Sequence, residues 1–341
     1  MLLTEKTIQN NQKNCPFISI VIPVKNEELL IGQCLESLKK LNYPRDKMEI
    51  IISDGLSNDN TVKIAQNYGA KVVENKIQTV APGRNIGFAI SKGDLVAFSD
   101  ADCVMDKNWL NNSLKYFKDE KVGGVGGPNL PPPNESYFEK AVRILFSLGS
   151  LISGSAHAIE LKKIKSVEGI PGCNAVYKRE VLKKAMPVDE SLLTCDDVEM
   201  NYKIIREGYK LLYAPDVVVW HYRRDNPRKF WKQIYRYAVG RLQLGKKRKE
   251  TLGFFHVLFG FFIPIFCFSF FFLYIFNFDY LLFFIKIISV FILIYFLSFL
   301  IQRKPFKLAF NVFLAFLIFI FAWSAGFLKE LIFPVKNAKG K

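Results

Sequence analysis

Two aspartates one residue apart follow an apolar run in the first third of the chain. Asp100 and Asp102 flank Ala101, directly after the apolar residues 95–99. Carboxylates this close together, where a strand runs into a turn, can bind one divalent cation and leave positions open for a ligand's phosphates. Solvated turns and helix caps contain such pairs as well, so an ordinary turn is the alternative. The strand and helix pattern upstream and a second acidic pair downstream favour the metal site.

That second pair, Asp196 and Asp197, is the candidate for general-base chemistry. Adjacent carboxylates repel each other and raise the pKa of one of them, which suits a group that must take up a proton. Both residues also begin an apparent helix, so N-capping is the alternative. His221 follows an apolar strand at 217–220 and is a candidate ligand for a metal or a phosphate, with a structural histidine as the alternative.

Alternating strands and helices must position these side chains. Short apolar runs predict strands at 17–24, 48–53, 71–74 and 95–99, and helical spacing predicts helices between them, the first capped by Asn26 and the third at 85–91. This alternation predicts a doubly wound α/β domain, in which ligands bind beyond the carboxyl ends of the strands. Asn26, Glu27, Asp54 and the acidic residues at 100–102 all fall at those ends.

Composition and charge divide the chain into two parts. It has 341 residues, 32 of them phenylalanine, and a formal charge of +16. Residues 1 to about 225 are typical of a soluble domain without a secretory signal, and 254–333 are almost continuously apolar. Basic residues cluster between 223 and 249 beside the apolar part, which favours anionic membrane lipids as partners and no nucleic acid. The six cysteines have no CxxC or metal-ligand spacing, so we expect buried thiols in a reduced setting.

The apolar part predicts a membrane anchor. Residues 226–250 form a basic, amphipathic stretch, interpreted as an interfacial helix on the cytosolic leaflet or, alternatively, an ordinary surface helix. Three apolar runs are each long enough to cross a bilayer: 254–276, 280–301 and 308–328. The second link between them contains three cations and the first none, which predicts a multi-pass protein of the cell membrane with a cytosolic catalytic domain. The cationic C-terminus argues mildly against three full spans, so the third could be re-entrant.

Six motifs in order resemble those of the family 2 inverting glycosyltransferases of the GT-A fold. They are SIVIPVKNEE at 19–28, SDGLSNDNT at 53–61, GRNIG at 83–87 leading into KGD at 92–94, SDAD at 99–102, GCNA at 172–175 and CDDVE at 195–199. The resemblance covers about residues 17 to 210. It implies a polar tail at 1–16, a GT-A (Rossmann-like) catalytic domain at 17–225, the interfacial helix at 226–250, a transmembrane region at 251–333 and a tail at 334–341.

The resemblance also implies roles for individual residues. Asp102, with Asp100 and His221, would hold Mg²⁺ or Mn²⁺ on the diphosphate, and Asp197 beside Asp196 would be the catalytic base. The nucleotide-sugar pocket would be formed by Pro23, Val24, Asn26, Glu27, Asp54, Arg84, Asp100, Ala101 and Asp102. The acceptor and its phosphates would contact Gly172, Asn174, Arg223, Arg224, Gln233, Arg236 and Tyr237. For Asp54 and Asp59 the alternative is turn and cap chemistry.

These roles predict transfer of a single sugar from a UDP- or GDP-sugar to a polyprenyl phosphate or lipid-linked glycan at the cytosolic membrane face. The stretch Gln233 to Tyr237 approaches the Gln-x-x-Arg-Trp signature of processive polysaccharide synthases, which is the first alternative. A nucleotidyltransferase that releases pyrophosphate, and a membrane scaffold with a vestigial site, are alternatives of other classes.

Overall fold

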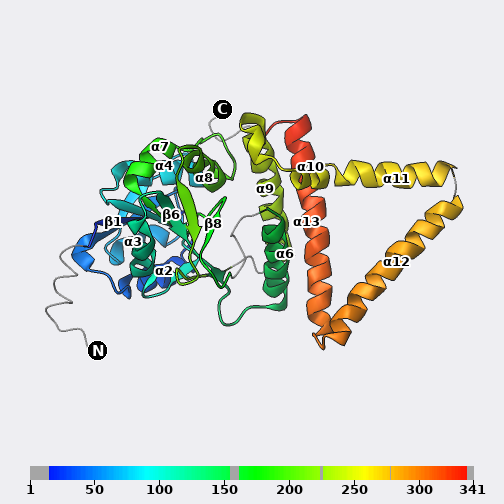
Figure 1. The fold of residues 1–341 in the computed structure, drawn as a ribbon, viewed down its shortest axis with the longest axis horizontal. Helices are drawn as coiled ribbons and strands as arrows, with labels where there is room; N and C mark the ends of the chain where they lie inside the picture. Colours follow the sequence, from blue (N-terminus) through cyan, green and yellow to red (C-terminus); the bar gives the residue numbers. More distant parts are fainter. Residues whose placement is uncertain (1–14, 154–160, 223–225, 277, 336–341) are drawn as a thin grey trace.

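The computed structural model describes residues 15–153, 161–222, 226–276 and 278–335, and its N-terminal part is an α/β domain (Figure 1). Eight strands form one sheet in the order β3-β2-β1-β4-β9-β6-β10-β8. Their bounds are β1 Ile18–Val24, β2 Met48–Asp54, β3 Lys71–Glu74, β4 Leu95–Ser99, β6 Val122–Gly126, β8 Lys165–Val167, β9 Asn174–Lys178 and β10 Lys210–Tyr213. The first four strands are parallel, as predicted, and β9 runs antiparallel to β4 and β6.

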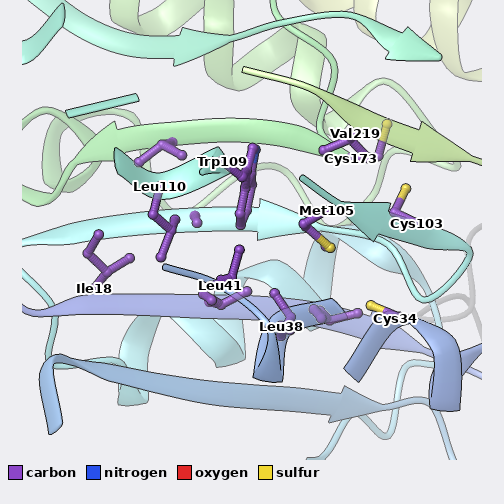
Figure 2. Packing of buried hydrophobic residues seen from close by; sticks show 14 of the residues in the cluster. Ile18, Cys34, Leu38, Leu41, Cys103, Met105, Trp109, Leu110, Cys173 and Val219 are labelled. Atoms are coloured by element: carbon purple, nitrogen blue, oxygen red, sulfur yellow. The ribbon is translucent and has the colours of Figure 1, made fainter. Parts of the chain in front are cut away.

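Helices cover both faces of this sheet because its strands are apolar on both sides. The helices are α2 Ile31–Lys39, α3 Thr61–Asn67, α4 Val80–Ile90, α5 Trp109–Leu114, α7 Arg179–Ala185 and α8 Asp196–Arg206. One face of the sheet packs with α2 and α5 through residues such as Leu35, Leu38 and Trp109, and Figure 2 shows part of this cluster. The other face packs with α7 and α8 through Val181 and Met200. Burial on both faces is what long β-branched runs require.

Two helices begin elsewhere than the sequence predicts. Asn26 does not cap the first helix, because α2 begins only at Ile31 and Asn26 lies in a left-handed turn with φ 55°. The helix predicted at 85–91 begins five residues earlier, at Val80, because Pro82 lies in its first turn, where a missing N–H costs no hydrogen bond.

A small second sheet lies beyond the end of β4. It contains β5 Cys103–Met105, β11 Val219–His221 and β7 Asn129–Leu130, in the order β5-β11-β7. In the antiparallel pairing of β5 with β11, His221 lies opposite Cys103. This pairing brings a residue more than a hundred positions downstream next to the acidic turn at 100–102.

Three long helices stand beside the α/β domain (Figure 1): α6 Tyr137–Ser153, α9 Pro227–Lys247 and α13 Phe306–Ile332. Phe230, Ile234, Ala238 and Leu242 of α9 share one buried cluster with α6 and α13. These four residues form most of the apolar stripe of the amphipathic stretch 226–250, which the sequence predicts to lie on the membrane surface. The stripe is therefore covered by protein, and only Trp231 of its large residues remains more than a third exposed.

The C-terminal apolar part forms α10 Phe254–Gly260, α11 Phe262–Phe276, α12 Phe278–Ile301 and α13. Within the described residues, α13 is the one helix long and apolar enough to cross a membrane. The pair α10 and α11 is bent by 53° and would add a second crossing if it counted as one span. One or two crossings are thus supported by length and composition, and the predicted three are not.

Candidate active site

The acidic turn at the end of β4 forms the centre of the site. All five residues of β4 are buried, and the chain then turns through Asp100, Ala101 and Asp102 into β5. The Cys103 N–H donates to the Asp100 carbonyl at 3.2 Å, which closes the turn. Ala101 is 4% and Asp102 8% exposed, whereas the Asp100 side chain keeps 37% of its surface. The turn therefore presents one buried and one accessible carboxylate.

His221 completes a group of three potential metal ligands. Its Nε2 lies 3.3 Å from Asp102 Oδ1, and one ligand atom each of Asp100, Asp102 and His221 lie within 4.8 Å of one another. Burial disfavours the imidazolium, but the Asp102 carboxylate outweighs it and raises the pKa of His221 to about 10. Two carboxylates and one imidazole are a donor set that fits Mg²⁺ or Mn²⁺. The predicted metal ligands are thus brought together.

Arg84 connects this turn to the second acidic pair. Its guanidinium, buried in α4, donates to Asp196 Oδ2, and its Nη2 lies 3.7 Å from Asp100 Oδ1. A Cβ added to Gly172 would lie 2.3 Å from Nη2, so the backbone of this glycine lies directly against the guanidinium. Arg84 Nε has no hydrogen-bond partner within the described part of the chain. The guanidinium that the sequence predicts as a fixed cation is thus present, and part of its charge is balanced by Asp196.

The two aspartates at the start of α8 differ in environment. Asp196 is 6% exposed, and burial raises its pKa although Arg84 opposes this. Asp197 is only partly buried; its Oδ1 accepts from the Val198 N–H at 2.8 Å and its Oδ2 from the Gly172 N–H at 3.2 Å. Asp196 is therefore the ion-pair partner of Arg84, and Asp197 is the more accessible carboxylate, held in orientation by two backbone amides.

The ends of β1 and β2 form a connected pair of turns. Asp54 is 4% exposed and accepts from the Ser57 N–H at 3.0 Å and from its hydroxyl at 2.5 Å. Asn26 Oδ1 accepts from the Asn58 N–H at 2.9 Å, and the Glu27 N–H donates to Thr61 Oγ1 at 2.8 Å. Both oxygens of the Asp54 carboxylate thus accept a hydrogen bond within the turn. Asp54 and Asp59 both accept hydrogen bonds within their turns, Asp59 Oδ1 from the Thr61 N–H at 3.0 Å, and the nucleotide-pocket role of Asp54 stays a prediction.

Pro23 and Val24 are the last residues of β1 and lie opposite Ser53 and Asp54 in the parallel register. A Cβ added to Gly83 would lie 2.9 Å from Pro23 Cβ, which shows how closely α4 packs on this strand end. Both residues thus lie at the carboxyl end of β1, and their place in the nucleotide-sugar pocket stays a prediction.

The residues predicted on the acceptor side separate into three groups. Asn174 is fully buried, and its amide is bonded to Trp109 Nε1 and to two backbone carbonyls, so its role is structural and the acceptor prediction for it is wrong. Gln233 donates to the Tyr237 hydroxyl at 2.9 Å on α9, beside the exposed Arg236. Arg223 and Arg224 lie outside the described residues.

Two cysteines lie near the predicted metal ligands, although the sequence predicts only buried thiols and no role for them in the site. Cys103 follows Asp102 directly, and Cys173 lies in the turn before β9, where Ser99 Oγ donates to its carbonyl at 3.0 Å. The ligand atoms of Cys103, Cys173 and His221 also lie within 4.8 Å of one another. The one signal available in the sequence was position, because Cys103 directly follows the motif at 99–102 and Cys173 lies within the motif at 172–175.

Comparisons with known proteins agree with this geometry. Residues 19–186 match the model of the family described as glycosyl transferase family 2. A probable glycosyltransferase, YdaM of Bacillus subtilis (strain 168), is 29% identical over 246 residues, which are 68% of this chain and 57% of that protein. A Methanococcus voltae protein is 27% identical over 339 residues, 93% of this chain and 97% of its own length. It is named dolichyl N-acetyl-alpha-D-glucosaminyl phosphate 3-beta-D-2,3-diacetamido-2,3-dideoxy-beta-D-glucuronosyltransferase.

Solved structures share the fold. The mannosyltransferase PcManGT of Pyrobaculum calidifontis, in complex with GDP-Man and Mn²⁺, has a TM-score of 0.65 at 19% identity, over 93% of this chain and 87% of that one. The S. aureus TarS 1-349 complex with UDP-GlcNAc has a TM-score of 0.51 at 17% identity, over 66% of each chain. At these identities the likeness is one of fold, and it confirms the predicted GT-A architecture.

Proposed function

We propose that this chain, whose residues 19–186 match the model of glycosyl transferase family 2, is a transferase that moves a single sugar from a UDP- or GDP-sugar to a lipid-linked acceptor, with inversion at the anomeric carbon. The observation that carries the proposal is the convergence of Asp100, Asp102 and His221 within 4.8 Å, beside an acidic pair linked to them by Arg84. Ligand carboxylates, a fixed cation and an accessible base are the parts that such a displacement needs.

Each residue of the site has a distinct task in this proposal. Asp100, Asp102 and His221 would hold the divalent cation, Mg²⁺ or Mn²⁺, which when bound stabilises the charge of the departing nucleoside diphosphate. Asp197 would accept the proton of the acceptor hydroxyl, because two backbone amides hold its carboxylate in one orientation. Arg84 would hold Asp196 and Asp100 in fixed positions through its guanidinium.

The lipid-linked acceptor is supported by the charges next to the apolar helices. Exposed cations line α9 beside the α/β domain: Arg228, Lys229, Lys232, Arg236, Lys246 and Lys247. At the cytosolic membrane face, such a surface attracts anionic lipid headgroups and lipid phosphates. The Methanococcus voltae relative, named for transfer to a dolichyl-phosphate-linked sugar, aligns with almost the whole chain and supports the same class of acceptor here.

A thermal-shift screen tests the donor side of the proposal. We expect UDP or GDP to raise the unfolding temperature only when Mn²⁺ or Mg²⁺ is present, because a ligand at 100 times its Kd stabilises by about 2.7 kcal/mol. Asp102→Ala should remove the metal-dependent part, and Asp46→Ala, at an exposed position outside the site, should retain it. The proposal is wrong if neither nucleotide stabilises the metal-loaded protein.

Product analysis tests the reaction class. Incubation with a nucleotide sugar and a polyprenyl phosphate should yield one added sugar and free nucleoside diphosphate. Release of pyrophosphate would instead identify a nucleotidyltransferase, and long products would identify a processive synthase.

A further inference from the structure

Three side chains beside the acidic turn form a cluster of a different chemistry. Cys103 begins β5, Cys173 lies in the turn before β9, and His221 ends β11, so two strands and one turn contribute one residue each. One ligand atom of each lies within 4.8 Å of those of the others. Figure 2 shows Cys103 and Cys173 at the same end of the buried cluster, with Cys34 on the neighbouring helix.

The surroundings hold these sulfur atoms in place. Cys103 is fully buried and Cys173 is 7% exposed. The Asn129 amide, itself 7% exposed, donates to Cys173 Sγ at 3.2 Å, and its Oδ1 has no partner within the described residues. Cys103 is fixed by its pairing opposite His221 across the small sheet. Because one sulfur is hydrogen-bonded and the other is on a paired strand, the two cysteine side chains need to move little when a ligand binds.

The donor atoms select the kind of ligand. Two thiolates bound at about 2.3 Å around a tetrahedral ion lie roughly 3.8 Å apart, which is compatible with ligand atoms that all lie within 4.8 Å of one another. Sulfur donors favour thiophilic ions over Mg²⁺ and Mn²⁺, which prefer oxygen. Asp102 Oδ1 lies 3.8 Å from Cys103 Sγ and 3.3 Å from His221 Nε2, so a fourth ligand is at hand.

We propose that Cys103, Cys173 and His221 form a second metal site, selective for thiophilic divalent cations of the Zn²⁺ class. This site shares His221, and through it Asp102, with the oxygen-rich site formed by Asp100 and Asp102. A thiophilic ion therefore withdraws ligands from the cation that supports sugar transfer. This last consequence rests on the proposed function; the metal site itself does not.

Cobalt spectroscopy tests the site without reference to activity. Reduced, metal-stripped protein titrated with Co²⁺ should develop a thiolate-to-cobalt charge-transfer band at one equivalent, and Zn²⁺ should displace it. The double variant Cys103→Ser/Cys173→Ser should lose the band. The control Cys34→Ser should keep it, because Cys34 is fully buried and donates to the Asp100 carbonyl at 3.6 Å but lies outside the trio.

Two results overturn the proposal: no thiolate band in the unaltered protein, or an undiminished band in the double variant. Because that variant could fail to fold, Asn129→Ala provides a second measurement with both sulfurs present. Loss of this supporting hydrogen bond should weaken Zn²⁺ binding about 10–100-fold, as removal of such partners does at other sites. Unchanged Zn²⁺ affinity in a folded Asn129→Ala protein contradicts the role given to the sulfurs.

An inhibition assay tests the sharing of His221. With Mn²⁺ fixed, Zn²⁺ should inhibit sugar transfer by the unaltered protein and by Cys34→Ser, and each variant is compared with its own rate without Zn²⁺. The double cysteine variant should resist Zn²⁺; equal inhibition of it overturns the shared-ligand scheme. A protein with the cobalt band but without transfer of any sugar would refute the proposed function and leave the metal site standing.

Discussion

At the scale of single residues, Arg84 lies between the acidic turn at 100–102 and the acidic pair at 196–197 and contacts both. Its guanidinium is 95% buried and contacts Asp196 on one side and Asp100 on the other. A buried cation left without its counterions is costly, so the ion pairs hold α4, α8 and the acidic turn at 100–102 in fixed relation. The guanidinium also faces the Phe98 ring, with 5.7 Å between Cζ and the ring centroid.

Gly172→Ala should disturb this arrangement from the backbone side. The new Cβ would lie 2.3 Å from Nη2 and 2.6 Å from Cζ of Arg84, so the guanidinium must move away from its carboxylates. We expect unfolding free energy to fall by about 1–3 kcal/mol and kcat/KM for sugar transfer to fall about 100-fold. Chemical denaturation and steady-state kinetics measure the two effects.

The matched control is Gly32→Ala in α2, where the nearest atom to a new Cβ is 3.9 Å away. It should stabilise the protein by about 0.5–1 kcal/mol and leave transfer unchanged, because alanine favours a helix interior. Normal kinetics in Gly172→Ala would mean that the position of Arg84 does not matter to catalysis.

Asp197→Asn should separate proton transfer from binding. An amide retains an oxygen that can accept from Val198 or Gly172, so the local structure persists while the basic group is lost. We expect transfer to a hydroxyl acceptor to fall about 100- to 10,000-fold with nucleotide affinity unchanged. Asp196→Asn, which loses the Arg84 pair, should instead lower both stability and nucleotide binding. Equal losses of affinity and turnover in Asp197→Asn would assign this residue to folding.

At the scale of elements, α9 holds the segment that leads into the acidic pair. The Leu193 N–H donates to Gln243 Oε1 at 2.9 Å, and Thr194 Oγ1 donates to the Arg236 carbonyl at 3.1 Å. A Cβ on Gly240 would lie 2.2 Å from Thr194 Oγ1, so only a glycine permits this approach. Asp197, the proposed base, therefore takes its position in part from a helix outside the α/β domain.

Glu330 extends this connection to α13. It is 3% exposed and accepts from Lys246 Nζ at 2.8 Å, from Gln243 Nε2 at 3.2 Å and from the Val335 N–H at 2.8 Å. Glu330→Gln should cost about 1–3 kcal/mol of unfolding free energy, because a charged acceptor of several hydrogen bonds is lost. It should also lower kcat with little change in the KM for the nucleotide sugar. Glu330 holds Gln243, and Gln243 accepts from Leu193 in the segment that leads to Asp197.

The exposed pair Lys184 and Glu207, 3.6 Å apart with both side chains nearly half exposed, provides the control. Glu207→Gln should change stability by less than about 1 kcal/mol and leave turnover unaltered. A Glu330→Gln protein that is destabilised but turns over normally would confine Glu330 to a structural role.

The sequence predicted the elements whose signal is local. Parallel apolar strands must end at one edge of the sheet, so the convergence of Asp54 and Asp100–Asp102 followed from four short runs of residues. The meeting of Cys103 with Cys173 was not predictable, because it depends on the pairing of the small second sheet and on a turn seventy residues downstream. The apolar stripe of α9 was visible, but a stripe fits a bilayer and a neighbouring helix equally well. Only the structure shows that α6 and α13 cover it.

At the scale of the whole molecule, the apolar C-terminal part divides into two. The helix α13 packs against α6 and α9 through Ala315, Ala322 and Phe327, and a Cβ on Gly326 would lie 2.3 Å from the Tyr235 carbonyl oxygen. Small residues at such a contact allow close helix approach where apolar lipid gives no driving force. In Figure 1, α11 and α12 extend away from this body and return to it at the start of α13. The catalytic domain and α13 therefore form one folded unit, to which α11 and α12 are appended.

Cysteine labelling can establish how this unit lies in a membrane. In a Cys15→Ser/Cys267→Ser background, Asp279→Cys and Lys304→Cys report on the two links between the apolar helices, and Lys92→Cys reports on the exposed surface of the catalytic domain. Within the described residues α13 is the one helix long and apolar enough to cross a membrane, and residues 302–307 before it carry three cations, so we expect Asp279→Cys and Lys304→Cys to share the cytosolic side with Lys92→Cys. A membrane-impermeant maleimide added to intact cells should then label none of the three positions, and all three in opened cells. External labelling of Asp279→Cys alone would mean that α11 and α12 each cross the membrane; external labelling of Lys92→Cys would reverse the orientation proposed for the catalytic domain.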